Sequence, residues 1–162
     1  RDKDAIVATM ALCEAAAYYK TQGKTLWDAM IEMYEQFGYY KDAIQSVTMK
    51  GIEGLQKIQE IMNSLRQNPP TEFAGHKVTA VRDYKADTIT DVATGAVKPT
   101  GLPNSNVLYY ELTEDAWVCV RPSGTEPKVK FYYGVKGTSL ADADEKSDIM
   151  GKAVLDMVDS MK

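Results

Sequence analysis

Hydrophobic residues recur at helical spacing in three segments of the chain, at about 26–37, 52–66 and 139–161. Apolar positions there fall at intervals of three and four residues, the period of a helix with one buried face. A fourth segment, Ala5–Tyr19, has apolar residues on nearly every side. A helix of that kind is normally buried between layers of a larger protein, so it is expected to need partners on several faces.

Residues with capping preferences support these boundaries. Thr25 and Ser139 are good N-caps, and Asp28 and Asp142 follow them by three residues, the spacing of a capping box. Gly38 follows the last apolar position of the helix expected at 26–37 and predicts its end. In the helix expected at 52–66, the core-facing stripe is expected to consist of Ile52, Leu55, Ile58, Met62 and Leu65.

Strand propensity and alternation predict extended segments at 39–49, 76–84, 107–112, 116–120 and 129–135. The last of them alternates most clearly. Its apolar face consists of Val129, Phe131, Tyr133 and Val135, and its other face carries Lys130, Tyr132 and Lys136. Residues 85–105 show little periodicity, so we expect a long loop there with room for a short irregular strand.

The order of these elements defines a fold class. From residue 41 onward it is strand, helix, four strands, helix, with one-sided helices and a strand that has one apolar face. This predicts an α+β domain, 41–162, in which a mainly antiparallel sheet carries two helices on one face. A hinge near Gly38–Tyr40 separates it from the helices of 1–38, which are expected to expose an apolar patch of roughly a few hundred Å².

Composition narrows the possible functions. The 162 residues carry a formal charge of −4, which disfavours non-specific binding of nucleic acid, and no apolar run is long enough to span a membrane. Cys13 and Cys119 are expected to be reduced and buried, as in a cytoplasmic protein. His76 has no ligand set around it, so no metal site is expected. Because the chain begins with Arg, we expect it to be a piece of a longer protein.

One stretch, residues 121–130, concentrates groups that bind anions. Arg121 can hold a phosphate through its planar fork, and the hydroxyls of Ser123 and Thr125 can donate hydrogen bonds. Gly124 can take a positive φ, which would turn successive N–H groups into one concavity. The same residue types also dominate ordinary turns, so residue chemistry alone leaves a plain hairpin connection with solvated charges open.

The sequence of residues 121–131, RPSGTEPKVKF, resembles the phosphate-binding loop in the C-terminal domain of the α-D-phosphohexomutases. Residues 1–5 (RDKDA) resemble a segment late in the third domain of that family, with Ala5 in place of the usual glycine. Residues 22–26 (QGKTL) and 101–108 (GLPNSNVL) resemble its bacterial phosphoglucomutase/phosphomannomutase branch. The resemblance extends along essentially the whole chain.

This resemblance implies roles for single residues. It assigns the non-transferring phosphate of a hexose phosphate to Arg121, Ser123, Gly124 and Thr125. Lys130, on the outward face beside the loop, is expected to reach the same phosphate. Lys3 is a possible substrate contact. Glu126 is expected to orient Arg121 or Lys130, and Lys128 to be a solvated surface charge.

The resemblance also implies a fold and an activity. The C-terminal domain would be TATA-binding-protein-like, and residues 1–38 would be the last helices of a third α/β domain. Members interconvert sugar 1- and 6-phosphates, here glucose phosphates, with a phosphoserine and a Mg²⁺ held by aspartates. The serine, metal and sugar loops are missing from this sequence, so it is expected to hold no catalytic residue or metal and to be inactive alone.

The expected partners are the hexose phosphate and the remaining domains of the parent enzyme, with neither nucleic acid nor a membrane. A stand-alone phosphate-binding or interaction module without catalysis, and specificity for mannose phosphate, remain alternatives.

Overall fold

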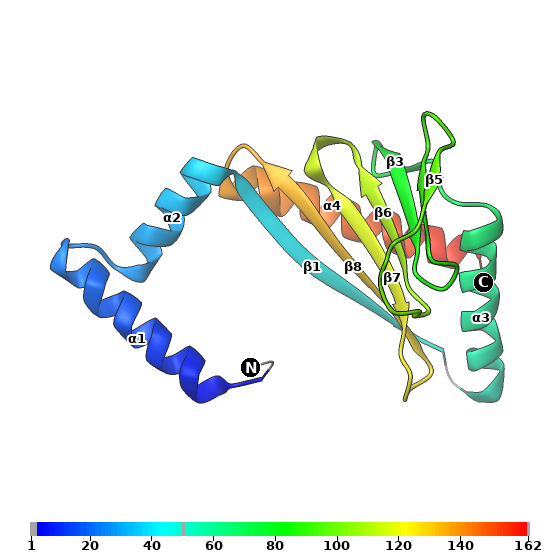
Figure 1. The fold of residues 1–162 in the computed structure, drawn as a ribbon, viewed down its shortest axis with the longest axis horizontal. Helices are drawn as coiled ribbons and strands as arrows, with labels where there is room; N and C mark the ends of the chain where they lie inside the picture. Colours follow the sequence, from blue (N-terminus) through cyan, green and yellow to red (C-terminus); the bar gives the residue numbers. More distant parts are fainter. Residues whose placement is uncertain (1–2, 50, 162) are drawn as a thin grey trace. The chain divides into compact units, whose positions relative to one another are not determined.

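The computed structural model describes residues 3–49 and 51–161, except for the side chain of Ile52. Arg1 and Asp2, part of one quoted motif, lie outside the described residues, as does the Ile52 side chain expected in a helical stripe. The chain divides into two compact units, Arg1–Tyr39 and Tyr40–Lys162 (Figure 1). Each is described by itself.

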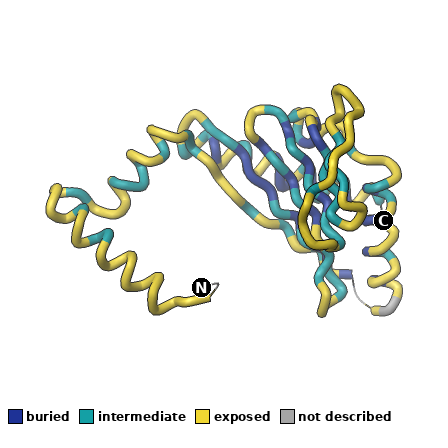
Figure 2. Tube along the Cα trace, in the orientation of Figure 1, coloured by how far each residue is buried: buried dark blue, intermediate teal, exposed yellow. Residues whose placement is uncertain are grey.

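The first unit consists of two helices, α1 (Ala5–Thr21) and α2 (Leu26–Phe37). The Asp4 carboxylate caps α1 by accepting from the Val7 N–H at 2.9 Å. The expected capping box of Thr25 and Asp28 begins α2, and Gly38 ends it with a φ of 113°. No described residue of either helix is buried (Figure 2). The Ile6 side chain, for example, is 75% exposed.

The second unit is built on an eight-stranded sheet. Its strands are β1 (Tyr39–Thr48), β2 (Glu72–Phe73), β3 (His76–Asp83), β4 (Thr88–Asp91), β5 (Val97–Lys98), β6 (Leu108–Leu112), β7 (Trp117–Pro122) and β8 (Lys128–Gly137). Seven of them follow the order β1-β8-β7-β6-β3-β4-β5, and β2 pairs with β3. Every pair of neighbouring strands among β2, β3, β4, β5, β6, β7 and β8 is antiparallel. The Met49 N–H donates to Pro127 and Asp42 lies against Gly134, so β1 is also antiparallel to β8.

Two helices, α3 (Gly51–Gln67) and α4 (Leu140–Ser160), pack on one side of this sheet. Their buried side chains join those of alternate strand residues in a single core. On β8 the core-facing residues are the four expected apolar ones, none more than 3% exposed. The predicted α+β class, a mainly antiparallel sheet with two helices on one face, is confirmed. The opposite face, which we call the open face, carries none of these core residues.

The expectation for residues 85–105 was wrong in part. This segment forms a hairpin of β4 and β5 that extends the sheet beside β3. The carboxylate of Asp91 accepts from the Thr94 N–H and hydroxyl, both at 2.7 Å, and Gly95 takes a φ of 69°. The strands are too short to show alternation, and the turn that joins them uses side chain to backbone hydrogen bonds.

Two further expectations require correction. Leu55 is 53% exposed and so is not part of the buried stripe of α3, whereas Ile61, not included in that stripe, is 1% exposed. Cys13, expected to be buried, is exposed on α1, and Cys119 on β7 is half-buried; both are free. The reason is the same for Leu55 and Cys13: helical spacing defines faces, but only a neighbouring element covers them.

A 3₁₀ turn, η1 (Thr113–Asp115), joins β6 and β7. Glu114 and Asp115 both take positive φ there. In the described part of the chain, no helix is both long enough and apolar enough to cross a membrane.

Candidate anion-binding site

The register of β7 and β8 places two cations side by side. Arg121 and Lys130 are direct partners across this antiparallel pair. Such partners extend from the same face of a sheet, with Cβ atoms roughly 4.5–5.5 Å apart. Their neighbours Val120 and Val129 are fully buried in the core, so Arg121 and Lys130 lie on the open face. Like charges directly opposite each other are unfavourable, and an anion between them would remove that cost.

The loop after Arg121 is closed by its own hydrogen bonds. The Ser123 N–H donates to the Lys128 carbonyl at 2.8 Å, which continues the pairing of β7 with β8. The Ser123 hydroxyl oxygen accepts from the N–H groups of Thr125 at 3.4 Å and Glu126 at 3.3 Å. Ser123 therefore shapes the loop, and its hydroxyl hydrogen is left to donate to a ligand.

The expected positive φ at Gly124 is not observed. A Cβ atom at this position would meet nothing within 4 Å, so the glycine faces open space. Its role is thus not to permit a special backbone conformation. The absence of a side chain leaves the rim of the loop uncovered, which allows a ligand to approach the backbone.

All five residues expected to bind phosphate come together around one pocket of about 340 Å³. The lining consists of Arg121, Pro122, Ser123, Gly124, Thr125, Lys130 and Tyr132. The pocket therefore combines two cations, two hydroxyls from the loop and a tyrosine, and it contains no carboxylate. That donor set suits a multiply charged anion, which needs several donors on different sides.

Glu126 and Lys128 have a different relation from the expected one. They form an ion pair with 2.5 Å between Nζ and Oε2, so Glu126 is held by Lys128, not by Arg121 or Lys130. The hydrogen bond and charge of Lys128 lower the pKa of Glu126, and the charge of Lys130 contributes less. The loop carboxylate is thus engaged outside the pocket, where it does not compete with an anion.

Lys3 lies in the first unit, where it is exposed. Its contact with a substrate stays a prediction.

Sequence reasoning did not assign Tyr132 to the pocket. The alternation of β8 was the available signal, because it puts Tyr132 on the same face as Lys130. Side chains also alternate along β7, so Trp117 and Cys119 lie on the same face as Arg121. These three residues continue the open face away from the loop.

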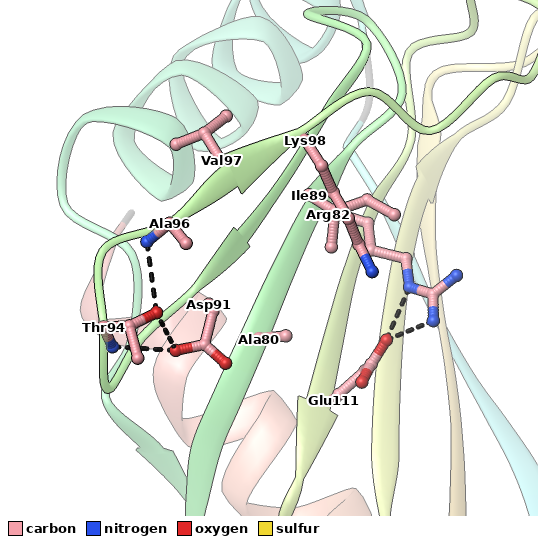
Figure 3. Close-up of a pocket in the computed structure, with 9 residues that line it drawn as sticks. All are labelled: Ala80, Arg82, Ile89, Asp91, Thr94, Ala96, Val97, Lys98 and Glu111. Carbon is pink, nitrogen blue, oxygen red and sulfur yellow. Dashed lines mark hydrogen bonds and ion pairs between the residues drawn. The ribbon is translucent and has the colours of Figure 1, made fainter.

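A second hollow lies on the open face across β3 to β6 (Figure 3). Arg82 and Glu111 form an ion pair there, and Glu111 raises the pKa of Arg82 through this hydrogen bond. Asp91, at the same hollow, is engaged by Thr94. With Lys98, which also lines it, the hollow has two cations and two carboxylates, which makes it a weaker anion site than the pocket beside Arg121.

No group of three or more metal-binding side chains gathers anywhere in residues 3–49 or 51–161.

Comparison with known proteins identifies the class to which this fold and pocket belong. Residues 61–152, more than half of the chain, match the family model of the phosphoglucomutase/phosphomannomutase C-terminal domain. The chain belongs to this family. It is 37% identical over 150 residues to the phosphoglucomutase of Staphylococcus aureus strain bovine RF122 / ET3-1, and 36% identical to that of strain MRSA252. These alignments cover 93% of the chain and 27% of either relative, so the chain spans about a quarter of their length.

A solved structure shares the fold. It is the open form of the exocytosis-sensitive phosphoprotein pp63/parafusin, a phosphoglucomutase from Paramecium. The TM-score is 0.56 with 16% sequence identity, over 99% of this chain and 28% of that one.

Proposed function

We propose that the second unit is the phosphate-binding domain of a phosphohexomutase and that its pocket holds the non-transferring phosphate of a hexose phosphate. The observation that carries this proposal is the pairing of Arg121 with Lys130 on the open face, beside a loop whose hydroxyls line the same pocket. Membership of the phosphoglucomutase/phosphomannomutase family supports it.

The parent activity that we propose is the interconversion of glucose 1-phosphate and glucose 6-phosphate. In phosphoryl transfer, a protein contributes mainly by positioning and by stabilising charge. Donors that grip the distal phosphate fix the other end of the sugar for reaction elsewhere, which is binding energy from a non-reacting part of the substrate. Arg121, Lys130 and the loop hydroxyls recognise phosphate, not sugar, so the same pocket suits either end of the substrate.

This role makes the chain a positioning part of the enzyme. A Mg²⁺ ion, where the parent uses one to stabilise charge on the transferred group, would have to be held by residues outside the described ones. The same is proposed for the phosphoserine, so the chain alone is expected to be inactive. Mannose and glucose differ at C2, which is remote from the pocket when the pocket holds a phosphate on C6, so in that orientation the pocket is not expected to discriminate between them.

We further propose that residues 1–38 are the last helices of an α/β domain. The support is that no described residue of α1 or α2 is buried, although α1 is apolar on nearly every side.

Substitution of Arg121 tests the phosphate site. Hydrogen bonds to charged groups contribute roughly 1.5–3 kcal/mol each, so Arg121→Ala is expected to weaken phosphate binding by about tenfold or more. Lys130→Ala should have a smaller effect, because lysine is a point charge without a planar fork. The measurement is titration of the chain with inorganic phosphate, followed by calorimetry or amide chemical shifts.

Lys77→Ala is the matched control, because Lys77 is an exposed cation on β3 outside the pocket. It removes the same unit of charge and should leave the dissociation constant nearly unchanged. Equal losses in Arg121→Ala and Lys77→Ala would show that only net charge is sensed. An unchanged affinity in Arg121→Ala would overturn the proposed function.

A further inference from the structure

The phosphate pocket continues into a shallower hollow on the open face, which we call the aromatic groove and which is distinct from the hollow at Arg82 and Glu111. Its volume is about 580 Å³. Besides Arg121 it is lined by Ser105, Val107, Tyr109, Trp117, Cys119 and Tyr132. Arg121 and Tyr132 line both hollows, so the two are contiguous.

The floor of the groove is a fixed aromatic surface. The rings of Tyr109 and Trp117 are stacked, with centroids 5.5 Å apart and planes 10° apart. The Trp117 indole lies against Gly134, where a Cβ atom would collide with it. On the other side the Arg82 guanidinium lies 5.6 Å from the Tyr109 centroid. Because these rings are held from both sides, little entropy would be lost when a ligand packs on the surface they form.

The wall of the groove is equally fixed, and it comes from the segment 101–108 that resembles a family motif. The Asp87 carboxylate accepts from the N–H groups of Thr100 at 3.0 Å and Gly101 at 3.2 Å. The Arg66 guanidinium donates to the Asn106 side-chain oxygen at 2.7 Å. Ser105 and Val107, which line the groove, therefore stand on an anchored loop.

The groove has no negative charge. Burial raises the pKa of the Cys119 thiol and of the Tyr109 phenol, so both are neutral near pH 7. Arg121, at the end next to the phosphate pocket, is its only charged lining residue. The groove thus offers an apolar surface with hydroxyls from Ser105 and the tyrosines, a composition that suits a neutral ring with polar edges.

The register gives the spacing between the two hollows. Cys119 and Tyr132 are partners two residues before and after the pair of Arg121 and Lys130. Two strand residues span roughly 6.6 Å, so a group joined to the phosphate by a few bonds would lie over Tyr132.

We propose that the aromatic groove receives the pyranose ring of the hexose phosphate, with Tyr132 as the surface on which an apolar C–H face of the sugar packs. This inference rests on the proposed phosphate site. It assigns to this unit a preference for phosphate attached to a ring, beyond the recognition of phosphate itself, and it makes Tyr132 a substrate-positioning residue.

The test compares three ligands that share a phosphate. Inorganic phosphate lacks a substituent, glycerol 3-phosphate has one without a ring, and glucose 6-phosphate has the pyranose. Glucose 6-phosphate is expected to bind more tightly than glycerol 3-phosphate. Tyr132→Ala should remove this difference. Because Tyr132 also lines the phosphate pocket, inorganic phosphate can lose affinity too, but the loss for glucose 6-phosphate should be roughly three- to tenfold greater, from the energy of a ring contact.

A second variant and a second readout separate the ring contact from folding. Tyr132→Phe keeps the ring and should retain the preference for glucose 6-phosphate. In a Trp27→Phe background Trp117 is the only tryptophan, since the chain has two. Glucose 6-phosphate should then change the Trp117 fluorescence at saturation, whereas inorganic phosphate should not.

Equal affinities for glycerol 3-phosphate and glucose 6-phosphate, with inorganic phosphate still bound, would overturn this inference alone. So would an equal loss of all three ligands in Tyr132→Ala. Failure of all three to bind the unmodified chain would overturn the proposed phosphate site and this inference with it.

Discussion

The helices of the two units begin in the same way but meet different surroundings. A threonine or serine side chain caps the start of each helix, Thr25 for α2 and Ser139 for α4. The capping box is complete only at α2, because the Asp142 carboxylate accepts from the Thr138 N–H and not from that of Ser139 as the spacing predicted. Yet α4 buries Met150, Val154 and Val158 completely, whereas no described residue of α1 or α2 is buried. Caps and spacing thus set where a helix forms, and a packed sheet decides what it contributes to stability. Among its described residues, the first unit has two helices and no sheet for them to pack on.

The open face shows a similar contrast between two cross-strand arrangements. Near β3 and β6, Arg82 has Glu111 as a partner, and the charges are satisfied within the chain. On β7 and β8, Arg121 instead has Lys130 directly opposite. The first arrangement stabilises the sheet, and the second leaves a local positive charge for a ligand. This difference distinguishes the proposed binding site from a structural ion pair.

The largest expected effect on stability comes from a comparison of two phenylalanines, one in each unit. Phe131 on β8 is 0% exposed and Phe37 at the end of α2 is 63% exposed. Phe131→Ala is expected to lower the free energy of unfolding of the second unit by about 3–5 kcal/mol, because it leaves a cavity in the core. Phe37→Ala should change it by less than about 0.5 kcal/mol. Urea denaturation followed by Trp117 fluorescence, in a Trp27→Phe background, measures both.

A comparable loss from Phe37→Ala would contradict the contrast between the units, because it would show that α2 supports the core of the second. A small loss from Phe131→Ala would instead contradict the description of that core.

A smaller effect distinguishes the two helix caps. The Ser139 hydroxyl accepts from the Asp142 N–H at 3.1 Å, and the Thr25 hydroxyl from the Asp28 N–H at 3.2 Å. Ser139→Ala should lower the free energy of unfolding of the second unit by about 1 kcal/mol. Thr25→Ala should reduce the helical circular dichroism of the first unit and leave the transition of the second unit in place.

Both caps should weaken in acid. Hydrogen bonds from backbone N–H groups, of Thr138 to Asp142 and of Thr25 to Asp28, are the largest causes that lower the pKa of these two carboxyls. A lowered folded-state pKa means a contribution present above the unfolded value and lost as the pH falls through the folded one. The effect of Asp142→Ala on the stability of the second unit should therefore shrink at low pH, and an effect that is constant with pH would contradict the role of the Asp142 carboxylate.

Some of these features could be predicted from local pattern, because local forces determine them. The alternation of Val129–Val135 predicted the buried face of β8, and the N-cap residues Thr25 and Ser139 predicted the starts of α2 and α4. Arg121 and the loop residues were found because a loop motif lies in consecutive residues. The structure brings these residues together, and their phosphate ligand stays a proposal.

Features that depend on contacts between distant segments were missed. The β4–β5 hairpin owes its place to pairing with β3, and its strands are too short to carry a period. Tyr132 lines the pocket because of the register of β8 against β7. Glu126 forms an ion pair with Lys128, not with Arg121. Exposure of Leu55 depends on which elements surround α3. None of these outcomes follows from residue type at a single position.

The smallest effect on the second unit is expected from removal of the whole of the first. The buried core and its packed neighbours lie within residues 43–161, with both helices and the sheet included. Deletion of residues 1–38 should therefore leave the urea transition of the second unit within about 0.5 kcal/mol of its original free energy. Phosphate affinity should also be unchanged, because the pocket residues lie in 121–132. If the shortened chain fails to fold, or loses more stability than Ser139→Ala, then the first unit supports the core and the division into two independent units is wrong.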